Sequence, residues 1–194
     1  MVDADRRSFL KWCTHGLGAI FAAILGVPAV AYLIDARNRK APDNAFRPVQ
    51  GVRVSDVNDI NRPVQGVLRD VRRDAWTLYP SDVIGRVWIV RARPGDTANC
   101  LQVFTTECPH LGCSINLAAD GAPFFKCPCH GAEFQCDGNR IERADYTNPA
   151  PRGMDALEVE LARDPDNADP NNRDLFMVRF EKFYQTRPTK DVRA

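Results

Sequence analysis

The chain carries almost no net charge, because 26 Lys and Arg residues are balanced by 25 Asp and Glu residues, which leaves +1 at pH 7. A protein held to nucleic acid by its phosphates needs a basic excess, so no nucleic-acid partner is expected. A length of 194 residues allows one domain with a real core plus an anchor or tail. Nothing in the sequence indicates two large domains.

The sequence also lacks a second long amphipathic helix after its N-terminal apolar stretch. From residue 49 onward it has short segments that are apolar or alternating and rich in β-branched and aromatic residues, separated by Gly and Pro. The clearest are residues 83–90, 101–104, 156–161 and 175–180. This pattern predicts a mainly β protein, an antiparallel β sandwich or barrel.

Histidine is scarce, yet two of the three His residues fall inside cysteine-rich motifs. The motifs are Cys108-Pro109-His110-Leu111-Gly112-Cys113 and Cys127-Pro128-Cys129-His130-Gly131. Sixteen residues separate His110 from Cys127, so the chain can fold here as two opposed loops, each with one sulfur and one nitrogen ligand. That donor set suits an iron-sulfur site with mixed ligands.

These motifs resemble those of the Rieske proteins, in which two histidines replace two cysteines on one iron of a 2Fe-2S cluster. The resemblance implies that Cys108 and Cys127 hold the inner iron, while His110 and His130 hold the outer iron nearer solvent. It also implies a disulfide between the two loops, formed by Cys113 and Cys129. The implied surroundings of the cluster are Leu111, Gly112, Pro128, Gly131, Ala132, Phe134, Pro149 and Pro151.

Two other classes use similar residues. A structural zinc site is disfavoured because zinc ligand pairs are usually separated by two or more residues, and one residue separates Cys108 from His110. Rieske ferredoxins and ring-hydroxylating oxygenases share both loops, but their pattern lacks the two further cysteines. Cys100 and Cys136 remain as either a second disulfide or two buried free thiols. Seven cysteines in a chain this short indicate metal binding and an oxidising compartment.

The N-terminus predicts the location. Arg6-Arg7-Ser8-Phe9-Leu10-Lys11 resembles a twin-arginine export signal and precedes an apolar stretch over residues 16–34. At 1.5 Å per residue this stretch spans about 28 Å, close to the hydrocarbon thickness of about 30 Å. Ala29-Val30-Ala31 resembles a cleavage site, but the apolar run continues to Ile34 and favours a retained anchor.

The expected domain order is therefore a signal region over 1–15, a transmembrane anchor over 16–34, a hinge over 35–48, a Rieske domain over 49–183 and a tail over 184–194. The loops that bind the cluster would form an inserted subdomain at about 105–148. The twelve residues from Asp35 to Phe46 would reach about 20 Å if flexible, enough for a moving head, although a passive linker has the same composition.

Two features bear on the redox partner. Asn148-Pro149-Ala150-Pro151 resembles the proline loop that covers the cluster in Rieske proteins that oxidise quinol, with Asn148 replacing the usual Gly. Asn tolerates left-handed backbone geometry, which would explain the replacement. Ala132 and Phe134 stand where the ubiquinol branch has Ser and Tyr, whose hydroxyls donate to sulfur. Their loss predicts a lower potential, matched to menaquinol.

The resemblance implies the Rieske subunit of a bacterial quinol:cytochrome c oxidoreductase, anchored in the cytoplasmic membrane with its head on the periplasmic face. Its expected partners are quinol and the cytochrome b and cytochrome c subunits of a dimeric complex, with His130 as the residue that contacts quinol and His110 as the second ligand of the outer iron. The alternative is the small subunit of a periplasmic molybdenum enzyme such as arsenite oxidase. Residues 163–173 and the tail match no known pattern.

Overall fold

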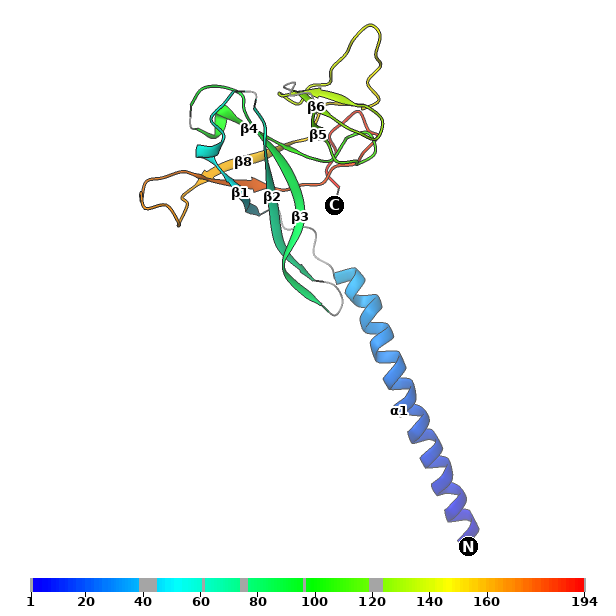
Figure 1. The fold of residues 1–194 in the computed structure, drawn as a ribbon. Helices are drawn as coiled ribbons and strands as arrows, with labels where there is room; N and C mark the ends of the chain where they lie inside the picture. The colour runs from blue at the N-terminus through cyan, green and yellow to red at the C-terminus, as the bar shows by residue number, and fades with distance from the viewer. Residues whose placement is uncertain are drawn as a thin grey trace. The chain divides into compact units, whose positions relative to one another are not determined.

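The computed structural model describes residues 2–38, 45–60, 62–73, 77–95, 97–118 and 124–193. The chain divides into two compact units, Met1–Asp43 and Asn44–Ala194. The first contains helix α1 (Val2–Asn38), and the second contains strands β1 to β9 (Figure 1). The mainly β class predicted from the sequence is confirmed.

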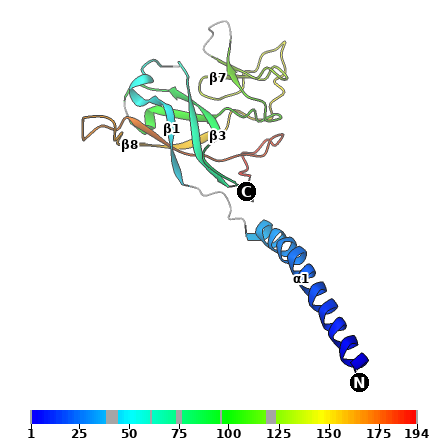
Figure 2. The ribbon, with the colours of Figure 1, turned by 60° about the horizontal axis from the view of Figure 1, so that its bottom comes forward.

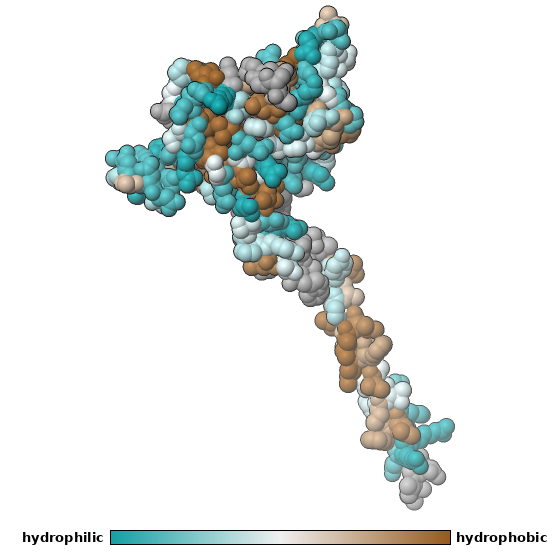
Figure 3. Space-filling model, in the orientation of Figure 1, coloured by the Kyte–Doolittle hydropathy of each residue, from teal (hydrophilic) through white to brown (hydrophobic). Residues whose placement is uncertain are grey.

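Helix α1 runs without interruption through Pro28 and extends beyond the predicted anchor at both ends. In the part of the chain that is described, it is the one helix long and apolar enough to cross a membrane, over Asp5–Ile34. Its large apolar side chains are exposed, and hydrophobic residues cover the middle of the helix in Figure 3. Of the predicted hinge over 35–48, residues 39–44 lie outside the described residues, while α1 continues to Asn38 and β1 begins at Phe46, so both ends of the predicted hinge belong to regular elements.

Six strands of the second unit close into an antiparallel barrel in the order β1-β2-β3-β4-β8-β9. Their bounds are Phe46–Arg53 (β1), Val64–Arg73 (β2), Leu78–Arg91 (β3), Leu101–Thr105 (β4), Ala156–Ala162 (β8) and Leu175–Arg179 (β9). Short 3-10 helices cover Val54–Asp56 and Ala98–Cys100. The four segments predicted as strands coincide with β3, β4, β8 and β9 to within one residue, except that β3 begins earlier.

Strand β3 connects two hydrophobic cores. Val87 and Ile89 point into the barrel, and Trp88 and Val90 point to the opposite face, because successive side chains of a strand alternate. The indole N–H of Trp88 donates to the carbonyl of Ile115 at 3.0 Å, and its ring lies 5.3 Å from that of Phe125. The outer face of the barrel therefore holds the segment that contains both cysteine motifs.

That segment lies between β4 and β8 and forms a small sheet in the order β5-β6-β7, seen beside the barrel in Figure 2. The strands are Asn116–Leu117 (β5), Phe124–Lys126 (β6) and Glu133–Gln135 (β7). Phe125 and Phe134 pair across β6 and β7, and both side chains are fully buried. One motif lies in what we call the first loop (residues 107–113), which precedes β5, and the other in the second loop (residues 127–131), which connects β6 to β7.

Candidate functional site

The first and second loops have the same backbone geometry. In the first loop, the amide of Gly112 donates to the carbonyl of Cys108 at 2.8 Å, and in the second, the amide of Gly131 donates to that of Cys127 at 3.1 Å. Both glycines have a positive φ, +77° and +74°, where a side chain is disfavoured. Each cysteine amide in turn donates 2.8 Å to the carbonyl of the residue after its glycine. The two motifs thus fold as a matched pair.

Sulfur and nitrogen donors lie at different depths. Cys108 and Cys127 are each 1 % exposed, whereas His130 is exposed and His110 half-buried. The two imidazole rings lie edge to face, with their centroids 4.7 Å apart. The structure therefore brings the four sequence-predicted ligands together as an inner pair of thiols and an outer pair of imidazoles.

The environment of Cys108 fits a metal ligand. Burial, together with the adjacent Cys127 thiol, raises the pKa of its thiol to about 12, although hydrogen bonds from the backbone amides of His110 and Leu111 act to lower it. Two buried thiols without a compensating cation favour the protonated form, whereas iron would hold both as thiolates. Two inner sulfurs and two outer nitrogens match the ligand set of a 2Fe-2S cluster of the Rieske type.

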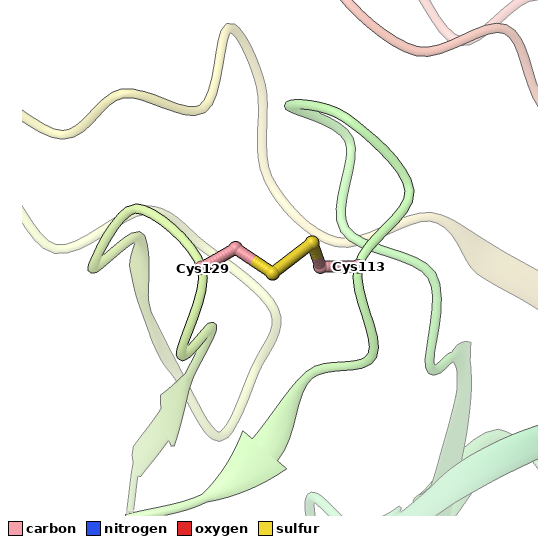
Figure 4. The surroundings of a disulfide bond; sticks show 2 residues. All are labelled: Cys113 and Cys129. Atoms are coloured by element: carbon pink, nitrogen blue, oxygen red, sulfur yellow. A yellow bond between two sulfur atoms is a disulfide. The ribbon is translucent and has the colours of Figure 1, made fainter.

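A disulfide joins the two loops, as the sequence resemblance implied. Cys113 and Cys129 are bonded, and the bridge crosses from the first loop to the second in Figure 4. The Cys127 sulfur lies within 4.8 Å of both bridged sulfurs, but these are already bonded and are not free to hold a metal. No disulfide joins Cys100 to Cys136, so the second bridge that the sequence left open is not formed; Cys136 is buried and Cys100 is half-buried.

A tyrosine and a buried carboxylate support the second loop. The Tyr146 hydroxyl donates to the carbonyl of Gly131 at 2.6 Å. Glu133, on β7, accepts ion pairs from Lys126 at 3.0 Å and Arg143 at 2.7 Å. Burial alone would raise the pKa of Glu133, but the two cations outweigh it and hold the pKa below the usual 4.5. No sequence pattern indicated a role for Tyr146, Glu133, Lys126 or Arg143.

The proline loop is held by Asn148, though not in the predicted way. Asn148 does not adopt a positive φ, so its backbone does not explain why it replaces Gly. Its buried side chain instead donates to the carbonyls of Glu133 at 2.6 Å and Ile141 at 3.2 Å, and accepts from the amide of Ala150 at 3.0 Å. An amide group can make all three bonds at once, which fixes Pro149 and the next residues against β7.

Two positions predicted to affect the potential are fully buried. Ala132 and Phe134 both have no exposed surface, and the Ala132 carbonyl accepts the bond from the Cys127 amide. Neither side chain has a hydroxyl, so neither can donate to sulfur. The remaining predicted surroundings of the site are less buried: Leu111 and Pro128 are exposed, while Gly112, Gly131, Pro149 and Pro151 are half-buried.

The fold and its donor set define a mixed-ligand iron-sulfur domain. Residues 66–153 match the family of the Rieske 2Fe-2S domain. An iron-sulfur subunit of the cytochrome b6-f complex from Gloeobacter violaceus is 39% identical over 166 residues, which cover 84% of this chain and 81% of that protein. This chain belongs to the Rieske iron-sulfur protein family, and its cofactor is a 2Fe-2S cluster.

Two further proteins are similar to this chain. The menaquinol:cytochrome c reductase iron-sulfur subunit of Bacillus subtilis is 28% identical over 142 residues, covering 72% of this chain and 78% of that protein. A solved structure described as a hyperthermophilic respiratory complex III matches with a TM-score of 0.36 and 19% identity, covering 84% of this chain and 98% of that chain.

Proposed function

We propose that this protein is the iron-sulfur subunit of a membrane-bound quinol:cytochrome c oxidoreductase, with menaquinol as its substrate. The observation that carries the proposal is the layering of the site, with two buried thiols beneath two imidazoles at the exposed end. The names of its relatives support the same class, since they are iron-sulfur subunits of menaquinol:cytochrome c reductase and cytochrome b6-f complexes.

Four side chains would hold the cofactor. In this proposal Cys108 and Cys127 bind the inner iron, and His110 and His130 bind the outer iron. A bound 2Fe-2S cluster supplies a one-electron acceptor whose potential is raised by its nitrogen ligands. Hydrogen bonds from the amides of His110 and Leu111 to the Cys108 sulfur favour the extra negative charge that reduction brings.

The exposed imidazole provides contact with substrate. His130 is the more exposed of the two rings, so we assign it the hydrogen bond from the quinol hydroxyl, with His110 as the second candidate. The ring nitrogen accepts the quinol proton as one electron leaves the same substrate, which couples the two transfers. In this proposal the half-buried prolines Pro149 and Pro151 and the exposed Leu111 would surround this contact and exclude water from it.

Membrane attachment follows from α1. Its exposed apolar surface needs lipid, and we propose that the helix is retained as a single-pass anchor with the globular unit on the periplasmic face. Cytochrome b and cytochrome c subunits of a dimeric complex would be the partners, and haem c the electron acceptor. The hinge predicted over residues 35–48 would let the globular unit move between the quinol site and that haem.

The test is purification of the complex in mild detergent, followed by haem spectra, metal analysis and low-temperature electron spin resonance. We expect b-type and c-type haem absorbance and a Rieske signal to copurify with this chain. Molybdenum in place of haem would indicate the periplasmic oxidase instead, and a colourless protein that contains zinc would overturn the proposal.

Single variants test the ligand assignment. His130→Ala is expected to abolish the Rieske signal and quinol oxidation, because it removes one of two nitrogen ligands. His15→Ala is the matched control: it is the third histidine of the chain, exposed on α1, and its loss should leave the signal intact. An unchanged spectrum in the His130 variant would contradict the ligand role.

The pH dependence of the midpoint tests the proton transfer. Reduction coupled to protonation of an imidazole lowers the midpoint as pH rises, by up to about 59 mV per pH unit for one proton and one electron. Redox titration of the purified protein from pH 6 to 10 should show this fall. A midpoint that stays level across that range would contradict proton uptake by the ring.

A further inference from the structure

The C-terminal segment, which matched no known sequence pattern, lies against the first loop. We call residues 183–193 the C-terminal strap; in Figure 1 it is the red segment beside the green loops. The amide of Thr186 donates to the carbonyl of Pro109 at 2.8 Å. Pro109 lies between Cys108 and His110, both proposed cluster ligands, so the strap reaches the site through one peptide group.

That peptide group has two ends with different partners. Its carbonyl, from Pro109, accepts the bond from the Thr186 amide, and its N–H, from His110, donates to the sulfur of Cys108. A donor to the carbonyl polarises the peptide and strengthens its N–H as a donor, and it also fixes the plane of the peptide. The strap thus acts on a hydrogen bond to sulfur that it does not itself make.

Thr186 adopts a backbone conformation that is costly for its side chain. Its φ is +63°, the one positive φ of a non-glycine residue in the described part of the chain. A β-branched residue there is a clear outlier, and such strain persists where surrounding contacts enforce it. The Thr186 hydroxyl donates to the carbonyl of Gln185 at 2.6 Å. The turn at Thr186 aims its N–H at Pro109.

A buried arginine holds the strap on both sides of Thr186. The Arg152 guanidinium donates to the carbonyls of Tyr184 at 2.9 Å and Arg187 at 2.6 Å. It also binds Asp155 through two bonds of 2.8 and 2.7 Å, and these two side chains are 9% and 5% exposed. Arg152 follows the proline loop directly, so one guanidinium joins that loop to the strap.

The strap is a closed unit with its own internal bonds. Within the strap the amide of Tyr184 donates to the carbonyl of Asp191 at 2.9 Å, and at its end the amide of Arg193 donates to the carbonyl of Lys182, the residue just before the strap, at 2.6 Å. Phe183, at its start, is buried in the barrel core. The strap is therefore fixed to the barrel at Phe183, and through its contact with Pro109 it can restrict the motion of the first loop.

We propose that the C-terminal strap is a positioning element of the cluster site, in which the Thr186 amide and the Arg152 clamp hold the Pro109–His110 peptide and so raise the midpoint potential. The inference rests on the proposed ligand role of Cys108 and His110. Thr186 and Arg152 do not touch cofactor or substrate and act only through the first loop.

The matched pair Thr186→Pro and Thr186→Gly tests this in the full-length protein. Proline has no N–H and cannot adopt the positive φ, while glycine keeps the N–H and relieves the strain. The proline variant should show a lower midpoint, a changed electron spin signal and faster amide exchange over residues 107–113, and the glycine variant should match wild type in all three. Arg152→Lys, which keeps a charge beside Asp155 but loses the fork geometry, should shift the midpoint in the same direction.

A wild-type midpoint and wild-type exchange in both Thr186→Pro and Arg152→Lys would overturn the proposal. If the Thr186→Pro protein cannot be produced in folded form, the same three measurements are made on Arg152→Lys and on a chain that ends after Phe183. Wild-type values in both of these proteins would overturn the proposal. A wild-type protein without a Rieske signal would instead refute the proposed function, and amide exchange over the first loop would still decide whether the strap positions it.

Discussion

The Tyr146 hydroxyl lies 2.6 Å from the carbonyl of Gly131, next to His130 in the second loop. The guanidinium of Arg143 lies 4.8 Å from the centre of the Tyr146 ring. Burial raises the pKa of Tyr146, with a further contribution from the negative charge of Glu133, so the hydroxyl stays protonated as a donor over the physiological range. One side chain outside the motif thus orients the backbone beside a proposed ligand.

Tyr146→Phe removes this bond and leaves the Gly131 carbonyl without its phenolic donor. We expect the free energy of unfolding to fall by about 1 kcal/mol, and the visible absorbance of the cluster to be lost at a lower temperature. Thermal unfolding followed by circular dichroism at visible and far-ultraviolet wavelengths measures both. Tyr79→Phe, on the exposed surface of β3, is the control and should change neither. Equal effects of the two variants would contradict the bracing role of Tyr146.

Glu133 links acid stability to the second loop. Because its pKa in the folded protein is below the usual 4.5, the carboxylate stabilises the fold fully above pH 4.5, and this contribution is lost as pH falls through the depressed pKa. Glu133→Gln should therefore lower stability at pH 7 by about 1–2 kcal/mol, a range that allows for the half-exposed Lys126 and Arg143. The difference from wild type should shrink as pH falls below 4.

Urea unfolding of both proteins between pH 7 and pH 3 checks this dependence. Glu158→Gln serves as the control, because Glu158 pairs with Arg179 at 2.7 Å while 57% of its side chain is exposed. Exposed pairs contribute little, so that variant should differ from wild type by less than about 0.5 kcal/mol at every pH. If the loss in free energy of unfolding in Glu133→Gln stayed constant down to pH 3, the charge of the Glu133 carboxylate would not be the cause of that loss.

The disulfide between the loops is expected to stabilise the site by restricting the unfolded chain. Cys113 and Cys129 are 16 residues apart, and closing a loop of that size contributes about 3 kcal/mol. The double variant Cys113→Ser with Cys129→Ser should lose about that much stability and release iron faster, measured with a ferrous chelator. Cys100→Ser alters a free thiol and should release iron at the wild-type rate. Equal rates in both variants would argue against the bridge as a clamp.

The sequence predicted the site better than its supports. The spacing within each motif indicated a short turn that carries one cysteine and one histidine, and each of these turns is closed by local bonds and a glycine. Strands β4, β8 and β9 were likewise evident, since half-buried strands alternate in polarity. Local patterns such as these depend on residues close in sequence.

Long-range contacts left no such local pattern. Thr186 meets Pro109 across 77 positions of sequence, calculated as 186 minus 109, through main-chain atoms that any residue possesses. Arg152 and Tyr146 lie in polar stretches typical of exposed turns, and nothing nearby indicates that one is buried or that the other reaches Gly131. The role of Asn148 was misjudged for a related reason: its backbone preference is a property of the residue alone, whereas its three bonds depend on β7.

The buried Ala132 and Phe134 lead to a prediction about the redox potential. The double variant Ala132→Ser with Phe134→Tyr adds two hydroxyls, which we expect to donate to sulfur and to stabilise the reduced state. A net gain of about 1 kcal/mol per bond corresponds to a rise of about 40 mV per donor for a one-electron couple. Redox titration followed by visible circular dichroism gives the midpoint, which lies between about −150 and +300 mV in this family.

The two single variants show how much each hydroxyl contributes to the rise in midpoint, and a third variant serves as the control. Ala132→Ser and Phe134→Tyr should each raise the midpoint by part of the total, because each adds one hydroxyl at a different position. Ala132 directly follows the second loop, and Phe134 lies in β7. Phe125→Leu, which alters the pairing partner of Phe134 without adding a donor, should leave the midpoint near wild type even though it weakens the core. If the double variant kept the wild-type potential, or if the leucine variant raised it equally, the missing hydroxyls would not set the potential, and the assignment of menaquinol would lose its physical basis.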